Sequence, residues 1–114
     1  MPDLTKPHPR YYGTFPRVLG KYTREEPVLS LPEAVRKMTT LPAFSMGLWD
    51  RGRLAPGYAA DVAIFDPATI LDTATYRDPQ QSPKGIDRVL VNGVEVVVAG
   101  KPTGATPGQV IRRW

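Results

Sequence analysis

Apolar residues recur at helical spacing between residues 30 and 39, which predicts a helix over this segment. The apolar stripe consists of Leu31, Ala34, Val35 and Met38. Ser30 and Glu33 have the S-x-x-E spacing of a capping box, in which each residue satisfies a free backbone N–H of the other. The pattern therefore predicts an amphipathic helix that begins just after Ser30.

Two shorter helices are predicted on either side of this one. Residues 14–21 would form a helix with Thr14 as its N-cap and Pro16 in its first turn, where the missing N–H costs nothing. Gly20 would end this helix, because glycine readily adopts the conformation that closes a helix C-terminus. The other short helix is predicted over residues 42–46.

Runs of β-branched and other apolar residues replace the helical spacing in the second half of the chain. Residues 61–66 form an apolar run bounded by acidic residues, which predicts a strand buried on both faces. Asn92 and Gly93 lie between two β-branched runs, residues 88–91 and 94–98. Because a two-residue hairpin turn needs positive φ at both positions, this pair predicts an antiparallel hairpin.

The remaining segments read as connections or short additions. Residues 67–85 carry three prolines and predict a long connection with one helical turn over residues 71–76. Residues 109–112 predict a last short strand. Residues 1–13 are rich in proline and hold little to bury, so we interpret them as an extended or mobile N-terminal arm.

The order of these elements predicts an α+β fold, with short N-terminal helices followed by a small antiparallel sheet or partial β-sandwich. The length of 114 residues fits one domain. Residues 14–114 would form that domain, helical over residues 14–47 and strand-rich over residues 48–114.

The amino-acid composition excludes several kinds of catalytic and binding site. The chain has no cysteine and one histidine, which excludes a disulfide scaffold, a thiolate zinc site, a cysteine nucleophile and an HExxH site built from this chain. The net charge of +4 is scattered, so a nucleic-acid binder is disfavoured. Neither a membrane span nor a signal peptide is recognisable, and the expected location is the cytoplasm.

Few residues are candidates for chemistry. His8, between Pro7 and Pro9, could contact a substrate or act as a general acid or base, but the residues alone favour an exposed loop histidine. Asp61 and Asp66 lie at opposite ends of the predicted strand, roughly 15 Å apart at about 3.3 Å per residue, so they cannot share a proton or an ion. The residues alone predict no complete active site.

The order of motifs resembles the C-terminal part of the amidohydrolase superfamily. Residues 51–66, R-G-R-L-A-P-G-Y-A-A-D-V-A-I-F-D, resemble its pattern G-x-L-x-x-G-x-x-A-D followed by alternating apolar residues. Residues 89–101 resemble the hairpin that follows, and residues 30–43 the preceding helix pair. Residues 8–20, H-P-R-Y-Y-G-T-F-P-R-V-L-G, are similar to one branch, the N-acyl-D-amino-acid deacylases or D-aminoacylases.

This resemblance implies a metal-dependent (β/α)₈ barrel with zinc ligands, a catalytic Asp after the last strand, and a small β-sandwich built from both ends of the chain. In the branch, the catalytic Asp lies in a Ser-Asp-Gly shortly before the segment that matches residues 8–20. No position here matches a metal ligand or that Asp, and Asp3 does not occupy its place. Zinc is therefore expected in a full-length parent and no cofactor in this chain.

The resemblance also assigns roles to particular positions. Its structural signature falls on Gly52, Gly57, Asp61, Asn92 and Gly93. His8 and Arg10 would lie near the substrate mouth of the parent, where the Arg10 guanidinium could pair with a substrate carboxylate. A structural role for a loop arginine is the alternative.

Together these observations predict a C-terminal fragment of a hydrolase that cleaves amide C–N bonds, inactive alone. The alternative is a non-catalytic module, either a truncated product or a subunit that completes a separately encoded barrel. Because the fragment would leave one face of its sheet uncovered, we expect it to bind a missing barrel domain or to self-associate.

Overall fold

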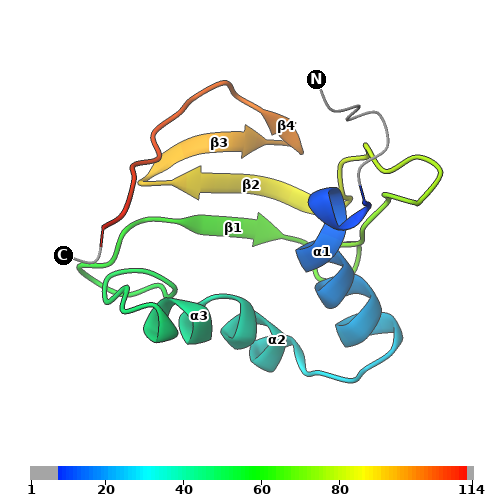
Figure 1. Ribbon diagram of the computed structural model, residues 1–114, viewed down its shortest axis with the longest axis horizontal. Coiled ribbons are helices and arrows are strands. Elements are labelled where there is room, and N and C mark those ends of the chain that lie inside the picture. Colours follow the sequence, from blue (N-terminus) through cyan, green and yellow to red (C-terminus); the bar gives the residue numbers. More distant parts are fainter. Residues whose placement is uncertain (1–7, 113–114) are drawn as a thin grey trace.

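An antiparallel sheet follows a group of helices in the computed structural model, which describes residues 8–112 (Figure 1). The helices are α1 (Arg10–Leu19), a π-helix η1 (Gly20–Glu25), α2 (Leu31–Met38) and α3 (Thr40–Ser45). The strands are β1 (Val62–Phe65), β2 (Ile86–Val91), β3 (Val94–Val98) and β4 (Lys101–Pro102). The α+β prediction is therefore confirmed. The described residues form a single sheet of order β1-β2-β3-β4, so the partial β-sandwich stays a prediction.

The first helix begins earlier than predicted. Helix α1 starts at Arg10 with Pro9 as its N-cap, and the Thr14 hydroxyl donates to the Arg10 carbonyl at 2.7 Å instead of capping. Pro16 accordingly lies inside the helix and not in its first turn. The extended-arm interpretation is thus wrong for residues 10–13, and residues 1–7 of that arm lie outside the described residues.

We predicted that Gly20 ends the first helix. Gly20 instead continues the helical path into η1, with a right-handed φ of −79°. The glycine has a packing role there. A Cβ at this position would lie 2.4 Å from the Ile70 carbonyl oxygen and 2.9 Å from Leu71 Cδ1. Only a residue without a side chain lets the helix approach the loop this closely.

Helix α2 confirms the prediction over residues 30–39, with one change at its start. The Ser30 hydroxyl accepts from the Glu33 N–H at 3.3 Å, as in a capping box. The Glu33 carboxylate, however, accepts two bonds from the Arg36 guanidinium, at 2.9 and 2.7 Å. An arginine one turn away is thus its partner in place of the Ser30 backbone. The next helix, α3, begins at Thr40, two residues before the predicted range of 42–46.

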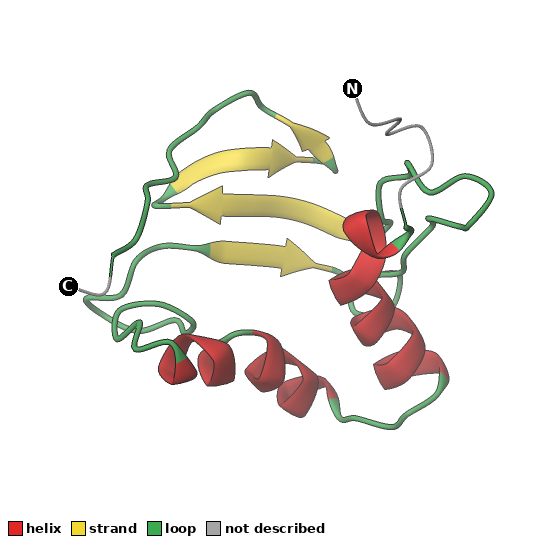
Figure 2. Cartoon of the chain, viewed as in Figure 1, coloured by secondary structure: helices red, strands yellow, loops and turns green. Residues whose placement is uncertain are grey.

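The predicted hairpin is confirmed. Strands β2 and β3 pair antiparallel through the Asn92-Gly93 turn, whose φ angles are 49° and 78°. Strand β1 pairs with β2, but the prediction that it is buried on both faces is wrong, because Ala63 and Ile64 are exposed. In the described chain no second layer covers that part of the strand (Figure 2).

Two smaller predictions are also wrong. Residues 71–76 form no helical turn; Leu71 instead pairs with Lys84 in an isolated bridge. Residues 109–112 form no strand, and the last strand is β4, which pairs with β3. Because Asn92 Nδ2 donates to the Pro107 carbonyl at 3.0 Å, the tail is held against the hairpin turn and not along a sheet edge.

The small core lies where the helices meet one end of the sheet. Leu19, Ala34 and Ile70 are buried together, which joins α1, α2 and the long connection. Phe65 at the end of β1 and Ile86 at the start of β2 pack against them. The helices are thus attached to the sheet mainly at this end.

Candidate functional site

The Asp61 carboxylate joins the glycine-rich loop to the hairpin turn. Its Oδ1 accepts from the Asn92 N–H at 2.9 Å, and its Oδ2 forms an ion pair with Arg51. Arg51 also donates to Asn92 Oδ1 at 3.3 Å, and the Gly93 N–H donates to the Ala60 carbonyl at 2.9 Å. This network holds two turns together, which is a structural task and not acid–base chemistry.

The two loop glycines of the signature have different surroundings. Gly52 and Gly57 both adopt positive φ, 89° and 83°. A Cβ at Gly52 would lie 2.8 Å from the Thr39 carbonyl oxygen, whereas a Cβ at Gly57 would meet nothing within 4 Å. The Thr40 hydroxyl also donates to the Gly52 carbonyl at 2.7 Å. Gly52 therefore docks the loop on the α2–α3 junction, and Gly57 only shapes a turn.

His8 and Arg10 lie together at the start of α1. The Arg10 N–H donates to His8 Nδ1 at 3.1 Å, and the Arg10 guanidinium carbon lies 5.7 Å from the centre of the exposed Tyr11 ring. His8 Nε2 lies 3.3 Å from the Tyr76 hydroxyl, and the two rings meet edge to face with their centres 5.2 Å apart. Within residues 8–112 no group accepts a hydrogen bond from the exposed Arg10 guanidinium, so its donors can reach a carboxylate.

Sequence reasoning missed Tyr76 and Asp72, which both come from the 67–85 connection. The Asp72 carboxylate pairs with Arg17 at 3.2 Å, and hydrogen bonds to Tyr22 and to Asp72 raise the pKa of the Arg17 guanidinium. No local signal could have found these partners, because Tyr76 contacts a residue 68 positions away. Only the path of the connection back to α1 brings them there.

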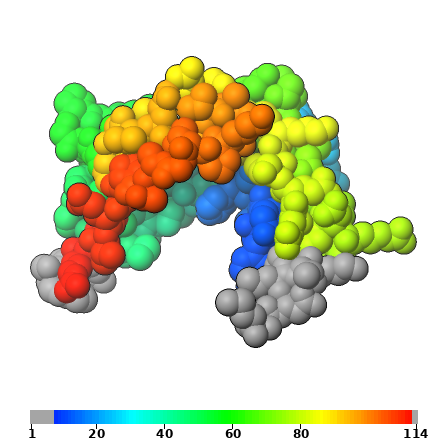
Figure 3. Space-filling view, turned by 90° about the horizontal axis from the view of Figure 1, so that it is seen from above, coloured from blue at the N-terminus to red at the C-terminus, as the bar shows by residue number. Residues whose placement is uncertain are grey.

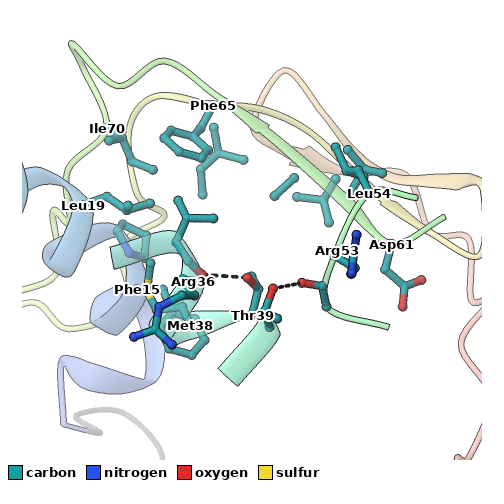
Figure 4. A pocket seen from close by; sticks show the side chains of 18 residues that line it. Phe15, Leu19, Arg36, Met38, Thr39, Arg53, Leu54, Asp61, Phe65 and Ile70 are labelled. Atoms are coloured by element: carbon teal, nitrogen blue, oxygen red, sulfur yellow. Dashed lines mark hydrogen bonds between the residues drawn. The ribbon is translucent and has the colours of Figure 1, made fainter. Parts of the chain in front are cut away.

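An apolar groove of about 800 Å³ separates the helices from the sheet (Figure 4). Its apolar lining includes Phe15, Leu19, Met38, Leu54, Phe65 and Ile70. Polar groups of Arg36, Thr39 and Asp61 also contribute to its lining. The space-filling view shows the molecule hollowed between α1 and the C-terminal tail (Figure 3). A surface of this kind fits apolar polypeptide better than a small charged ligand.

A family model matches most of this chain. The model of the amidohydrolase family matches residues 2–102. The chain belongs to this family.

The chain is similar over most of its length to two relatives and to one solved structure. The chain is 50% identical to an N-acyl-D-glutamate deacylase and 48% identical to a D-aminoacylase, both from Alcaligenes xylosoxydans xylosoxydans. Each match covers 99% of this chain and 23% of the relative, so the chain spans about a quarter of their length. A D-aminoacylase crystal structure, described as defining a novel subset of amidohydrolases, superposes with a TM-score of 0.86 at 49% identity, over 88% of this chain and 21% of that one.

The described residues of this amidohydrolase chain do not form a zinc site. A solved N-acyl-D-glutamate deacylase from Bordetella bronchiseptica is complexed with zinc; it is 48% identical, with a TM-score of 0.79, over 85% of this chain and 21% of its own. Here the sole histidine is already engaged by Arg10 and Tyr76, and the sequence has no cysteine. Within residues 8–112, no three His, Asp or Glu side chains gather in one place.

The carboxylates considered from the sequence are likewise occupied. Asp61 pairs with Arg51, and the Asp66 carboxylate accepts from the Ala68 N–H at 2.8 Å.

The helices of the described chain are all too short to cross a bilayer.

Proposed function

We propose that this chain is part of a hydrolase that cleaves the amide C–N bond of N-acyl-D-amino acids. The observation that carries the proposal is the identity of about one half, over nearly the whole chain, to an N-acyl-D-glutamate deacylase and a D-aminoacylase. The proposal also draws on a shared backbone arrangement at a TM-score of 0.86.

In this proposal the metal ligands and the catalytic Asp come from polypeptide outside this chain. The chain offers one histidine and no cysteine, and within residues 8–112 no three His, Asp or Glu side chains lie together. It therefore supplies no ligand set, and alone it is expected to be inactive. The chain contributes structural support for the enzyme and one edge of the substrate site.

That edge is formed by Arg10 and His8. The Arg10 guanidinium is exposed beside the Tyr11 ring, and its planar fork suits bidentate recognition of a carboxylate. Every N-acyl-D-amino acid carries such a group on its α-carbon. The proposed role of Arg10 is to bind this carboxylate and so to orient the amide bond.

The apolar groove gives the remaining polypeptide a place to pack. Phe15 and Leu54, which line it, are 61% and 78% exposed in this chain. Covering such side chains releases roughly 25 cal/mol for each Å² removed from water. We therefore place the barrel domain of the hydrolase, which carries the metal site in this proposal, against this groove.

A chimera tests the proposal. In the Alcaligenes D-aminoacylase, the region that matches this chain is replaced by the chain itself, and release of D-amino acid from N-acetyl-D-amino acids is measured with zinc present. We expect the chimera to be active and the isolated chain to show no turnover. Hydrolysis by the isolated chain would contradict the assignment of the ligands elsewhere. A folded, zinc-loaded chimera without activity would contradict the proposed role.

The uncovered groove also favours a second candidate, a non-catalytic subunit that completes a separately encoded barrel. The genomic sequence upstream of Met1 distinguishes the two. A continuous reading frame that ends in Ser-Asp-Gly supports one polypeptide, whereas a neighbouring gene for the barrel supports a split enzyme. A cytoplasmic location stays a prediction in both cases.

A further inference from the structure

The 67–85 connection is held firmly against α1. A Cβ at Gly13 would lie 2.6 Å from Asp72 Cβ, so helix and loop are in the closest contact that a glycine allows. Arg17 pairs with Asp72 at 3.2 Å, and the Arg24 guanidinium donates to the Ile70 carbonyl at 2.8 Å. These contacts anchor the connection along the helix.

Tyr76 sits in a turn that is itself fixed. The Thr75 N–H donates to the Asp78 carbonyl at 3.0 Å, and the Asp78 N–H donates to the Thr75 hydroxyl at 2.9 Å. The Gln81 side-chain amide closes the turn by donating to the Asp78 carbonyl at 3.0 Å. The Tyr76 ring is 78% exposed, yet its backbone is held at a defined distance from the start of α1.

The bonds of His8 fix the position of its proton. Nδ1 accepts from the Arg10 N–H, so in the neutral ring Nδ1 carries no hydrogen and Nε2 does. Nε2 then donates to the Tyr76 hydroxyl at 3.3 Å. Because Nδ1 is occupied as an acceptor, His8 has no free lone pair for proton abstraction, and its interpretation as a general base is disfavoured.

We propose that Tyr76 is a positioning residue for Arg10 and acts through His8. The Tyr76 hydroxyl accepts from Nε2 of His8, and Nδ1 of the same ring accepts from the Arg10 N–H. These two hydrogen bonds fix the first turn of α1, from which the Arg10 side chain extends. The importance of this arrangement for the carboxylate of an N-acyl-D-amino acid rests on the proposed function, but the arrangement itself does not.

The lone histidine makes the test specific, because an ¹⁵N spectrum of the imidazole contains one residue. The Arg10 amide proton is followed while His8 is titrated. In the wild type it should shift with His8, since protonation turns Nδ1 from an acceptor into a donor. In Tyr76→Phe, which keeps the ring and loses the hydroxyl, we expect the size of this shift to fall at least about twofold. Tyr12→Phe, on the same helix, is the matched control.

A second variant separates positioning from general folding. His8→Asn keeps an acceptor near the place of Nδ1 but is too short to reach Tyr76. In this background Tyr76→Phe should leave the Arg10 amide unchanged, because the link is already cut. An equal Arg10 shift in wild type and Tyr76→Phe would overturn the proposal. So would an effect of Tyr76→Phe that persists in His8→Asn.

The chimera supplies the functional readout. Loss of one neutral hydrogen bond is worth about 1 kcal/mol, which corresponds to roughly a fivefold rise in KM for Tyr76→Phe with little change in kcat. An active chimera whose KM does not respond would overturn the link between Tyr76 and substrate binding. If the wild-type chimera is inactive, the proposed function fails, and the spectra still decide whether Tyr76 positions Arg10.

Discussion

Glycine positions decide how closely loops approach helices in this chain. Gly85 has a φ of 83°, and a Cβ there would lie 2.5 Å from both the backbone N and the Cα of Ile70. Gly104 has nearly the same φ, 86°, but a Cβ there would meet nothing within 4 Å. Substitutions at Gly85 and Gly104 therefore measure separately the free-energy cost of a left-handed backbone and the cost of a steric clash.

We expect Gly104→Ala to lower the free energy of unfolding by about 1–2 kcal/mol, the usual cost of a left-handed residue with a side chain. Gly85→Ala should cost at least about 2 kcal/mol more, because Ile70 is buried backbone that cannot move aside. Urea denaturation measures both. Equal losses would show that the connection shifts without cost.

The Asp61 network makes a second prediction at single positions. Asp61→Ala should cost about 1–3 kcal/mol, because the Asn92 N–H loses its acceptor and Arg51 its ion-pair partner. Asp61→Asn keeps an acceptor oxygen and should cost less. Denaturation of both variants in urea checks the order. If the alanine variant is the more stable of the two, the bond to Asn92 does not hold the turns together.

Individual helices depend on contacts at their ends. Helix α2 begins with a proline in its first turn, an accepting Ser30 hydroxyl and an acidic Glu33, and it ends with Arg36 and Lys37. This distribution matches the helix dipole at both ends. The hydrogen bond from Arg36, more than the charges around it, holds the pKa of the Glu33 carboxyl below its ordinary value of 4.5.

The lowered pKa predicts how the contribution of Glu33 depends on pH. A carboxyl with a lower pKa in the folded state stabilises the fold above its unfolded pKa, and this stabilisation disappears as the pH falls through the folded value. Glu33→Gln should therefore be less stable than wild type at pH 7, and the difference should disappear as the pH falls below 4.5 and through the lowered pKa of the folded state. Thermal denaturation across this range measures it. In an Arg36→Gln background the same change should show a weaker pH dependence.

The whole chain exposes more surface than a protein of its size should. Its accessible surface is 8424 Å², whereas a folded monomer of 12.6 kDa is expected to expose about 6,200 Å². The total includes the chain ends, but within residues 8–112 large apolar side chains such as Phe15, Trp49 and Leu54 are more than half exposed. The chain is therefore expected to bind polypeptide through its apolar groove.

In the absence of a barrel domain, we expect the isolated chain to self-associate through this groove. Leu54→Glu, inside the groove, should shift the weight-average mass toward the monomer, because a charge there opposes apolar burial. Val28→Glu is the control, since Val28 is 74% exposed but lies outside the groove. Size-exclusion chromatography with light scattering checks both. A wild type that is monomeric at every concentration would contradict the expectation.

The predictions that were confirmed depend on neighbours in the sequence. The start of α2 follows from Ser30 three residues before Glu33, and the hairpin from an Asn-Gly pair between β-branched runs. One of the wrong predictions depends on a distant partner. The sequence indicated a helix end at Gly20. The glycine is explained instead by its packing against Ile70, because a side chain there would clash with a loop 50 positions away.

By itself the sequence determined the helix cap, the hairpin turn, the order of motifs that resembles amidohydrolases, and a composition with one histidine and no cysteine. Each of these follows from residue type or short spacing. Only the tertiary structure decided that Tyr76 meets His8, that Asp72 meets α1, and that an apolar groove lies between helices and sheet. These features arise where surfaces far apart in the chain pack together, and which surfaces pack is set by the fold as a whole.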